Sequence, residues 1–344
     1  MNRSTNAEKG LLFLAVLCVL RAGRAIFLPL AAAMFLWILI WLLESAFGRL
    51  CRRAKLPSAF QELARIVSIS AIMGILWLVI EVIGGNLAEA SHSFARYQAN
   101  VGSIVERFNA RFGTSFDLAQ LVGRIDMASV ANEVVGRTAG LIRGVFMAVI
   151  YLVFILLEEK SMAKKLPLVF KGGLKKLLDR ATVDKILGKI GTYLAVKTLC
   201  GVLTGAAAYA LMRHIGLDFA LFWALLMFLF NYIPTIGSIV ASLPPIALSL
   251  LQFDGAAGPF LAAAVGITAI QVAIGQILEP RIMGARVGLS PLAMIVSLVV
   301  WGWIWGVGGM FLCVPIMLIA LIVMYNVPGT KKFAVLLSQD GKNI

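Results

Sequence analysis

Residues 219–251 read FALFWALLMFLFNYIPTIGSIVASLPPIALSLL, an apolar run that is interrupted in its middle by Pro234 and Gly237. A helix that crosses the hydrocarbon core of a bilayer needs about 20 apolar residues. The whole run exceeds one crossing, yet each half is short for a full one. Non-helical backbone at membrane depth survives only against protein or a water-filled cavity. The run therefore predicts either two tight crossings or one re-entrant hairpin.

A second broken apolar run covers residues 290–326, where Gly306, Gly308 and Gly309 interrupt it and Pro315 follows. The same two alternatives apply to this run. Unbroken apolar runs account for the other predicted membrane segments, and the first of them is a retained segment rather than a cleaved signal peptide. These unbroken segments are 9–22, 25–43, 63–85, 138–157, 192–212 and 259–279. The sequence thus predicts about eight membrane segments.

The composition of the 344-residue chain supports an all-α integral membrane protein. Apolar residues make up 60% of it and charged residues only 14%, whereas soluble proteins have about 45–50% and about 25%. This balance excludes a soluble enzyme, a disordered chain and a secreted disulfide module. The net charge of +14, from 31 basic and 17 acidic residues, indicates loops on one side of a bilayer rather than a nucleic-acid partner.

The distribution of basic residues predicts the orientation of the segments. Loop 158–191 has nine basic and four acidic residues, and loop 44–65 has five and two. Residues 86–137 have five of each sign. Basic loops stay in the cytoplasm, so 86–137 is predicted to be external and both termini cytoplasmic, provided that 63–85 and 138–157 each cross once.

Cysteine labelling tests this orientation. A cysteine that replaces Lys171 is expected to react only from the cytoplasmic side, and one that replaces Asn109 only from the outside, because charged loops do not equilibrate across a bilayer. The measurement is labelling of intact cells with an impermeant thiol reagent. Reaction at Lys171→Cys from outside would contradict the predicted orientation.

Two extramembrane regions have amphipathic patterns. In 86–137, apolar residues from Phe94 to Phe108 recur at helical spacing up to Gly113. They predict either a small helical cap or a surface for subunits or substrate entry. Region 158–191 predicts a basic amphipathic helix at the anionic inner leaflet. The predicted division of the chain is 1–85, 86–137, 138–157, 158–191, 192–326 and a cytoplasmic tail at 327–344.

No enzyme motif occurs in the sequence, and only two histidines are present. We therefore predict no enzymatic activity, no catalytic residues, no metal site and no cofactor. The chain has no ATP-binding cassette motif, so any driving force has to come from an ion gradient, a membrane potential or the gradient of the solute.

Polar residues surround the break in the first interrupted run. Pro234 removes a backbone donor and frees a carbonyl, and Gly237 follows it. The candidate binding residues of this region are Asn231, Pro234, Thr235, Gly237 and Ser238. They predict either a structural kink, in which these side chains hydrogen-bond the freed backbone groups, or a site for a polar substrate.

The end of the 259–279 segment holds the strongest ionic signal. Gln271, Gln276 and Glu279 fall within about 140° on an α-helix. Pro280 ends the segment beside Arg281 and Arg286. The group predicts either a site that handles a cation or proton, or a static pair between Glu279 and an arginine. Lys197 lies a short distance into its own span, and we interpret it as a side chain that snorkels to the cytoplasmic interface.

Two tryptophans in the second broken run are further candidates. Trp301 and Trp305 share one helix face, and Trp303 points away from it. The pair predicts either an interfacial aromatic belt with packing or a stacking surface for a small polyol.

Three strings in the C-terminal half resemble the autoinducer-2 exporter family, also called PurR-regulated permease-like proteins. The order of segments along nearly the whole chain also fits that family. The strings are Asn231-x-x-Pro234-x-x-Gly237, Glu279-Pro280-Arg281-x-x-Gly284-x-x-Val287-Gly288-Leu289-Ser290-Pro291, and Trp301-Gly302-Trp303-x-x-Gly306-x-x-Gly309-Met310 with Pro315.

The resemblance implies a multi-pass transporter of the bacterial inner membrane that forms homo-oligomers. Members of the family are associated with export of autoinducer-2, a small hydrophilic polyol, or with sodium(lithium)/proton antiport. The predicted function is thus a secondary transporter or facilitator in the lipid bilayer for a small polar solute or a monovalent cation. A non-transporting membrane scaffold is the other alternative, but paired broken helices with polar residues favour transport.

Overall fold

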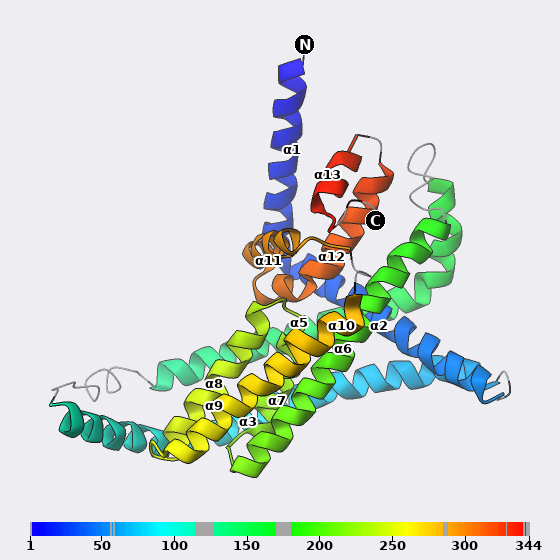
Figure 1. Cartoon of the computed structure of the whole chain (residues 1–344). Helices are drawn as coiled ribbons and strands as arrows, with labels where there is room; N and C mark the ends of the chain where they lie inside the picture. Colours follow the sequence, from blue (N-terminus) through cyan, green and yellow to red (C-terminus); the bar gives the residue numbers. More distant parts are fainter. Residues whose placement is uncertain are drawn as a thin grey trace. The chain divides into compact units, whose positions relative to one another are not determined.

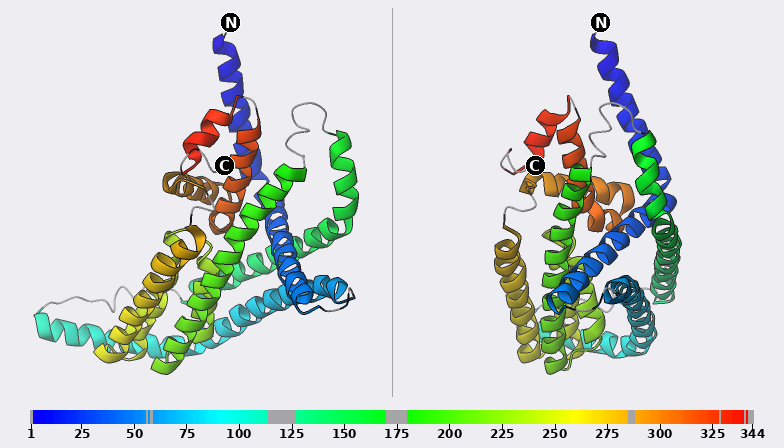
Figure 2. Two further views of the ribbon diagram at one scale, coloured as in Figure 1. Left: turned by 45° about the vertical axis from the view of Figure 1, so that its right-hand side comes forward. Right: turned by 90° about the vertical axis from the view of Figure 1, so that its right-hand side faces the viewer.

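The computed structural model confirms the all-α fold. Figures 1 and 2 show long helices, and the only other regular pairing within the described residues is an isolated bridge between Leu289 and Ser338. The structure describes residues 2–55, 57, 59–113, 127–169, 180–284, 288–327, 329–339 and 341.

Six of the described helices are long and apolar enough to span a membrane. Three shorter apolar helices belong to the two predicted broken runs: Ala220–Phe230, Ile236–Gln252 and Pro291–Trp305. The final half of the second run is itself one of the six, so it is longer than predicted. The six spans are Arg24–Arg53, Leu63–Asn86, Gly140–Met162, Lys185–Ile215, Ala257–Met283 and Val307–Asn326.

The chain forms two compact units, which we describe separately. The first unit contains Met1–Ile72, Gly144–Ala195 and Met283–Ile344. The second unit contains Met73–Arg143 and Val196–Ile282. Both predicted broken runs fall within single units, the 219–251 run in the second and the 290–326 run in the first.

In the first unit, α1 (Asn2–Ala22) covers the predicted first segment and α2 (Arg24–Arg53) follows it after Gly23. The C-terminal helices are α11 (Pro291–Trp305), α12 (Val307–Asn326) and α13 (Lys331–Leu337). α11 and α12 pack so closely at Gly309 that a Cβ atom there would lie 2.0 Å from the Trp301 carbonyl oxygen.

The second unit contains α6 (Arg180–Ile215) from Val196 onward, together with α7 (Ala220–Phe230), α8 (Ile236–Gln252) and α9 (Ala257–Gln271). Small residues permit the close approach of α6 and α7, since a Cβ at Gly205 would lie 3.1 Å from the Ala224 carbonyl oxygen. The buried core includes Ala208, Met212, Leu217, Ala220, Ala224, Met227, Ala241, Ala263 and Ile267.

Helix α3 (Ala59–Phe112) continues from its apolar span through the predicted amphipathic helix without a break. The helix ends at Phe112 and is followed by Gly113, whose positive φ of 63° suits a residue without a Cβ. After Gly113, the structure describes the rest of region 86–137 only from the start of α5 (Met127–Val169). Residues 170–179 of the predicted basic helix lie outside the described residues.

Candidate functional site

The break between α7 and α8 is a tight reversal at residues 231–235. Thr235 has φ 59° and ψ −56°, and the Ile236 N–H donates to the Pro234 carbonyl over 2.6 Å. These values describe a γ-turn of the rare, strained form. Only glycine fits at position 237, because the Cβ of any other residue would lie 1.9 Å from the Phe230 carbonyl oxygen. The predicted helix break is therefore present, and local geometry fixes its shape.

Side chains of the break attach it to α6. The Asn231 amide donates to the Lys197 carbonyl over 3.3 Å. The Tyr232 hydroxyl lies 2.7 Å from the Thr198 hydroxyl in a hydrogen bond. Asn231 and Tyr232 are both buried. Two consecutive residues of α6 thus hold two consecutive residues of the break.

A chain of hydrogen bonds connects the break to the end of α9. The Ser238 hydroxyl donates to the Thr235 carbonyl over 2.9 Å, and the Ser242 hydroxyl donates to the Ser238 carbonyl over 2.7 Å. Gln271 then donates to the Ser242 hydroxyl over 3.2 Å. The side chain of Thr235 is exposed. Among the predicted residues, Ser238 and Gln271 are therefore brought into one polar chain.

A buried ion pair lies at the centre of this region. The Lys197 ammonium is 2.6 Å from the Glu279 carboxylate, and their side chains are only 8% and 15% exposed. Glu279 begins α10 (Glu279–Met283). The prediction that Lys197 snorkels was wrong, because its charge is neutralised inside the protein by Glu279. Sequence reasoning missed Thr198, Tyr232 and the pairing of Lys197, since the partners of these residues are distant in sequence.

The segment before Glu279 is a π-helix, η2 (Val272–Leu278), in which the Glu279 N–H donates to the Ile274 carbonyl. The predicted common face of Gln271, Gln276 and Glu279 assumed α-helical spacing, and that assumption was wrong. A π-helix rotates through a smaller angle per residue than an α-helix, and such segments are rare but frequently occur at functional sites. Gln276 and Arg281 are exposed, and Arg286 lies outside the described residues.

The two candidate tryptophans belong to the first unit. Their ring centroids are 4.8 Å apart, which agrees with the predicted common face. The Trp305 indole is 8% exposed and donates to the Leu20 carbonyl over 3.0 Å. Trp303 is exposed and its ring lies 4.0 Å from the Arg21 guanidinium. Packing against α1 thus accounts for the position of Trp305.

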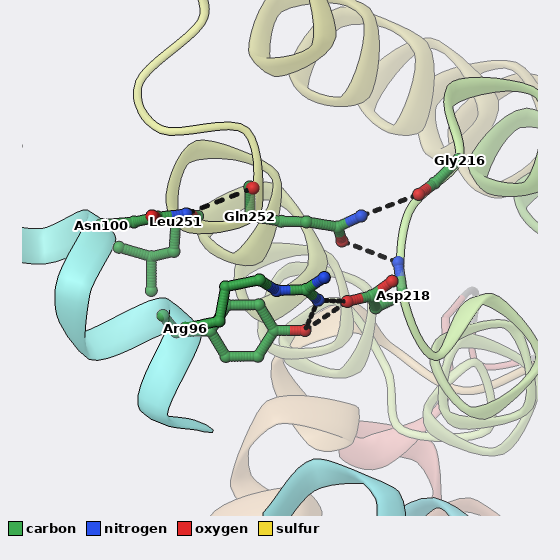
Figure 3. A network of polar contacts seen from close by, with 7 residues as sticks. Arg96, Asn100, Gly216, Asp218, Leu251 and Gln252 are labelled. Carbon is green, nitrogen blue, oxygen red and sulfur yellow. Dashed lines mark hydrogen bonds and ion pairs between the residues drawn. The ribbon is translucent and has the colours of Figure 1, made fainter. Parts of the chain in front are cut away.

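A second polar network, formed by Arg96, Tyr97, Asp218 and Gln252, connects α3 to the turn between α6 and α7 (Figure 3). Arg96 and the Tyr97 hydroxyl both donate to the Asp218 carboxylate. The Asp218 N–H donates to the Gln252 side chain, which in turn donates to the Gly216 carbonyl. Burial, and then the bond to Asp218, raise the pKa of the Tyr97 phenol. Tyr97 therefore stays protonated and donates at physiological pH.

The same face of α3 continues to the turn between α8 and α9. Asn100 donates to the Leu251 carbonyl over 2.8 Å (Figure 3). Ser103 donates to the Asp254 carboxylate, and Arg107 lies 2.6 Å from it. Polar residues at helical spacing were the available sequence signal for this network. Their partners could not be predicted, because they lie in turns far along the chain.

We expect Asp218→Asn to lower the free energy of unfolding by about 1 kcal/mol or less, because exposed ion pairs contribute little. Arg96 is 54% exposed and Asp218 29%. The difference from the parent should shrink when salt is raised to about 0.5 M, since salt screens exposed charges. Denaturant unfolding in detergent at two salt concentrations measures both effects. A larger loss that is insensitive to salt would contradict this account.

Apolar helices long enough to cross a bilayer, a tight break between two shorter apolar helices and an ion pair between two of the candidate spans define the class of the protein. It is a multi-pass membrane protein of the transporter class, since broken apolar helices with polar contacts are characteristic of transporters.

Comparison with known proteins agrees with this class. The family model described as AI-2E family transporter matches residues 11–329, and the chain belongs to this family. It is 28% identical to a putative transport protein of Haemophilus influenzae, over 98% of each chain. It is 29% identical to the AI-2 transport protein TqsA of Escherichia coli, over 95% of this chain and 93% of that protein. A sodium-lithium/proton antiporter of Halobacillus andaensis is 33% identical over 30% of this chain and 28% of its own.

Proposed function

We propose that the chain is a secondary transporter or facilitator that exports a small polar solute similar to autoinducer-2. Its place is the bacterial inner membrane, with both termini in the cytoplasm. The family and the full-length similarity to an AI-2 transport protein support this proposal. The charge distribution of the loops supports the orientation.

The observation that carries the proposal is the buried pair of Lys197 and Glu279. Each residue belongs to a candidate span, Lys185–Ile215 or Ala257–Met283. Ionisable groups in spans are costly and usually have a functional role. This pair also adjoins the α7–α8 break, because Lys197 accepts the hydrogen bond from Asn231.

The chemistry of the pair suits a polar solute. When Lys197 and Glu279 are in contact, each neutralises the other. When they separate, the ammonium donates hydrogen bonds and the carboxylate accepts them, so together they bind hydroxyl and carbonyl groups of a polyol. Separation of the two charges is also a step to which an ion gradient can be coupled.

Antiport of monovalent cations and protons is the second candidate. Glu279 is the only acidic residue between Asp254 and Asp340, and a carboxylate released from Lys197 binds either a sodium ion or a proton. The partial similarity to a sodium-lithium/proton antiporter supports this alternative.

Flux through the purified protein in liposomes distinguishes the candidates. Vesicles are loaded with autoinducer-2 or with radioactive sodium, and a pH or sodium gradient is imposed. Export predicts solute flux that requires the protein, and antiport predicts sodium flux that the pH gradient drives without the solute. Absence of both fluxes from folded protein would favour a scaffold and overturn the proposal.

A further inference from the structure

Helix α13 packs against the end of α12, as both views in Figure 2 show. Ala334, on the side of α13 that faces α12, is fully buried. Ser338, the first residue after the helix, is only 7% exposed. The Lys331 ammonium lies 4.7 Å from the centre of the Tyr325 ring on α12. The short helix is thus an integral part of the first unit rather than a loose tail.

Backbone pairing prevents α13 from rotating. The Ser290 N–H donates to the Leu337 carbonyl over 3.0 Å, and the Gln339 N–H donates to the Gly288 carbonyl over 3.0 Å. Leu289 and Ser338 form an antiparallel bridge between these bonds. The segment just before α11 therefore holds the end of α13, and the outward face of the helix has a fixed direction.

That outward face is apolar although no residue in the described part of the chain covers it. Phe333 is 59% exposed, Leu336 is 78% exposed and Val335 is 41% exposed. Phe333 and Leu336 are neighbours one turn apart on the helix. Lys331 and Lys332 are exposed at its start, and the sequence has no acidic residue between Glu279 and Asp340. The helix therefore combines exposed apolar side chains with two exposed lysines at its start.

We propose that the outward face of α13 lies in the headgroup region of the membrane and binds the anionic leaflet. Helix α12 is a candidate span that ends at Asn326, and only residues 327–330 separate it from α13. The helix therefore begins at the membrane surface. Apolar side chains enter the boundary between headgroups and acyl chains, and lysines bind anionic headgroups.

A site-directed label on the full-length protein in vesicles tests this. The exposed Cys18 is first replaced by alanine, since the other three cysteines are buried. A fluorophore is then attached at Leu336→Cys or, as the matched control, at the exposed polar Gln339→Cys. The vesicles contain neutral phosphatidylcholine alone or with phosphatidylglycerol, and quenchers are either attached to lipid near the headgroup or dissolved in water.

Lipid-attached quencher is expected to quench the label at Leu336 about threefold more than the label at Gln339. Phosphatidylglycerol should increase this quenching, and Lys331→Gln with Lys332→Gln should abolish the increase. Equal quenching with and without phosphatidylglycerol would overturn the proposal. So would dominant quenching from water at both positions, or a label at Leu336 that neither quencher reaches and that cross-links to a second copy of the chain.

Discussion

Gly237→Ala is expected to lower the free energy of unfolding by about 3 kcal/mol, the upper end of the usual cost of overpacking. The added Cβ would lie 1.9 Å from the Phe230 carbonyl oxygen and 2.9 Å from the Ile233 Cβ. Backbone atoms of the same tight turn cannot move aside as a flexible side chain does. The turn must therefore open, and the hydrogen bonds of Asn231 and Tyr232 to α6 weaken with it.

The measurement is thermal or denaturant unfolding of the purified protein in detergent. Gly258→Ala is the matched control, because it lies in α9 of the same unit and no heavy atom stands within 4 Å of its added Cβ. Alanine there should be neutral or stabilising by up to about 1 kcal/mol. If Gly237→Ala unfolds like the parent, the close approach of the turn to Gly237 is wrong.

Removal of either charge of the buried pair is expected to destabilise the protein by about 3–5 kcal/mol, because the remaining charge is left buried without a partner. Lys197→Met leaves the carboxylate of Glu279, and Glu279→Gln leaves the ammonium of Lys197. The double variant leaves neither, so its stability should recover to near that of the parent. Denaturant unfolding of the three variants in detergent measures the coupling energy.

Transport by the same variants separates a coupling role from a structural one. If the pair couples transport to a gradient, the double variant is folded and stable but loses gradient-driven flux at least about tenfold. Glu279→Gln should also lose gradient dependence per folded molecule. A double variant that transports at the parent rate, with its full response to the gradient, would remove the pair from the mechanism.

Arg213→Gln is the matched control for these charge removals. Arg213 is also on α6 but is exposed, so its substitution should change stability by no more than about 0.5 kcal/mol. Gradient-driven flux of this control should equal that of the parent. A comparable loss of flux in Arg213→Gln would show that net charge on α6, rather than the buried pair, controls transport.

The amino-acid sequence by itself determined the all-α membrane fold, because membrane spans depend on length and apolar character, which are local properties. It also placed the two breaks, at Pro234 with Gly237 and at Gly306, because proline and glycine limit the backbone wherever they occur. The helix that ends just before Gly113 was predictable for the same reason. Glu279 was identifiable as unusual, since it is an isolated acid at the end of an apolar run.

Only the tertiary structure decided which groups meet. The partner of Glu279 is Lys197 rather than a neighbouring arginine, because the packing of α6 brings a distant ammonium within 2.6 Å. The π-helix at Val272–Leu278 changes the faces of Gln271, Gln276 and Glu279, and side-chain periodicity does not reveal it. Likewise, Tyr97 and Arg107 of α3 contact the carboxylates of Asp218 and Asp254, which lie in two turns far along the chain. Ion pairs and hydrogen bonds act only over a few ångströms, so the folded chain alone determines their partners.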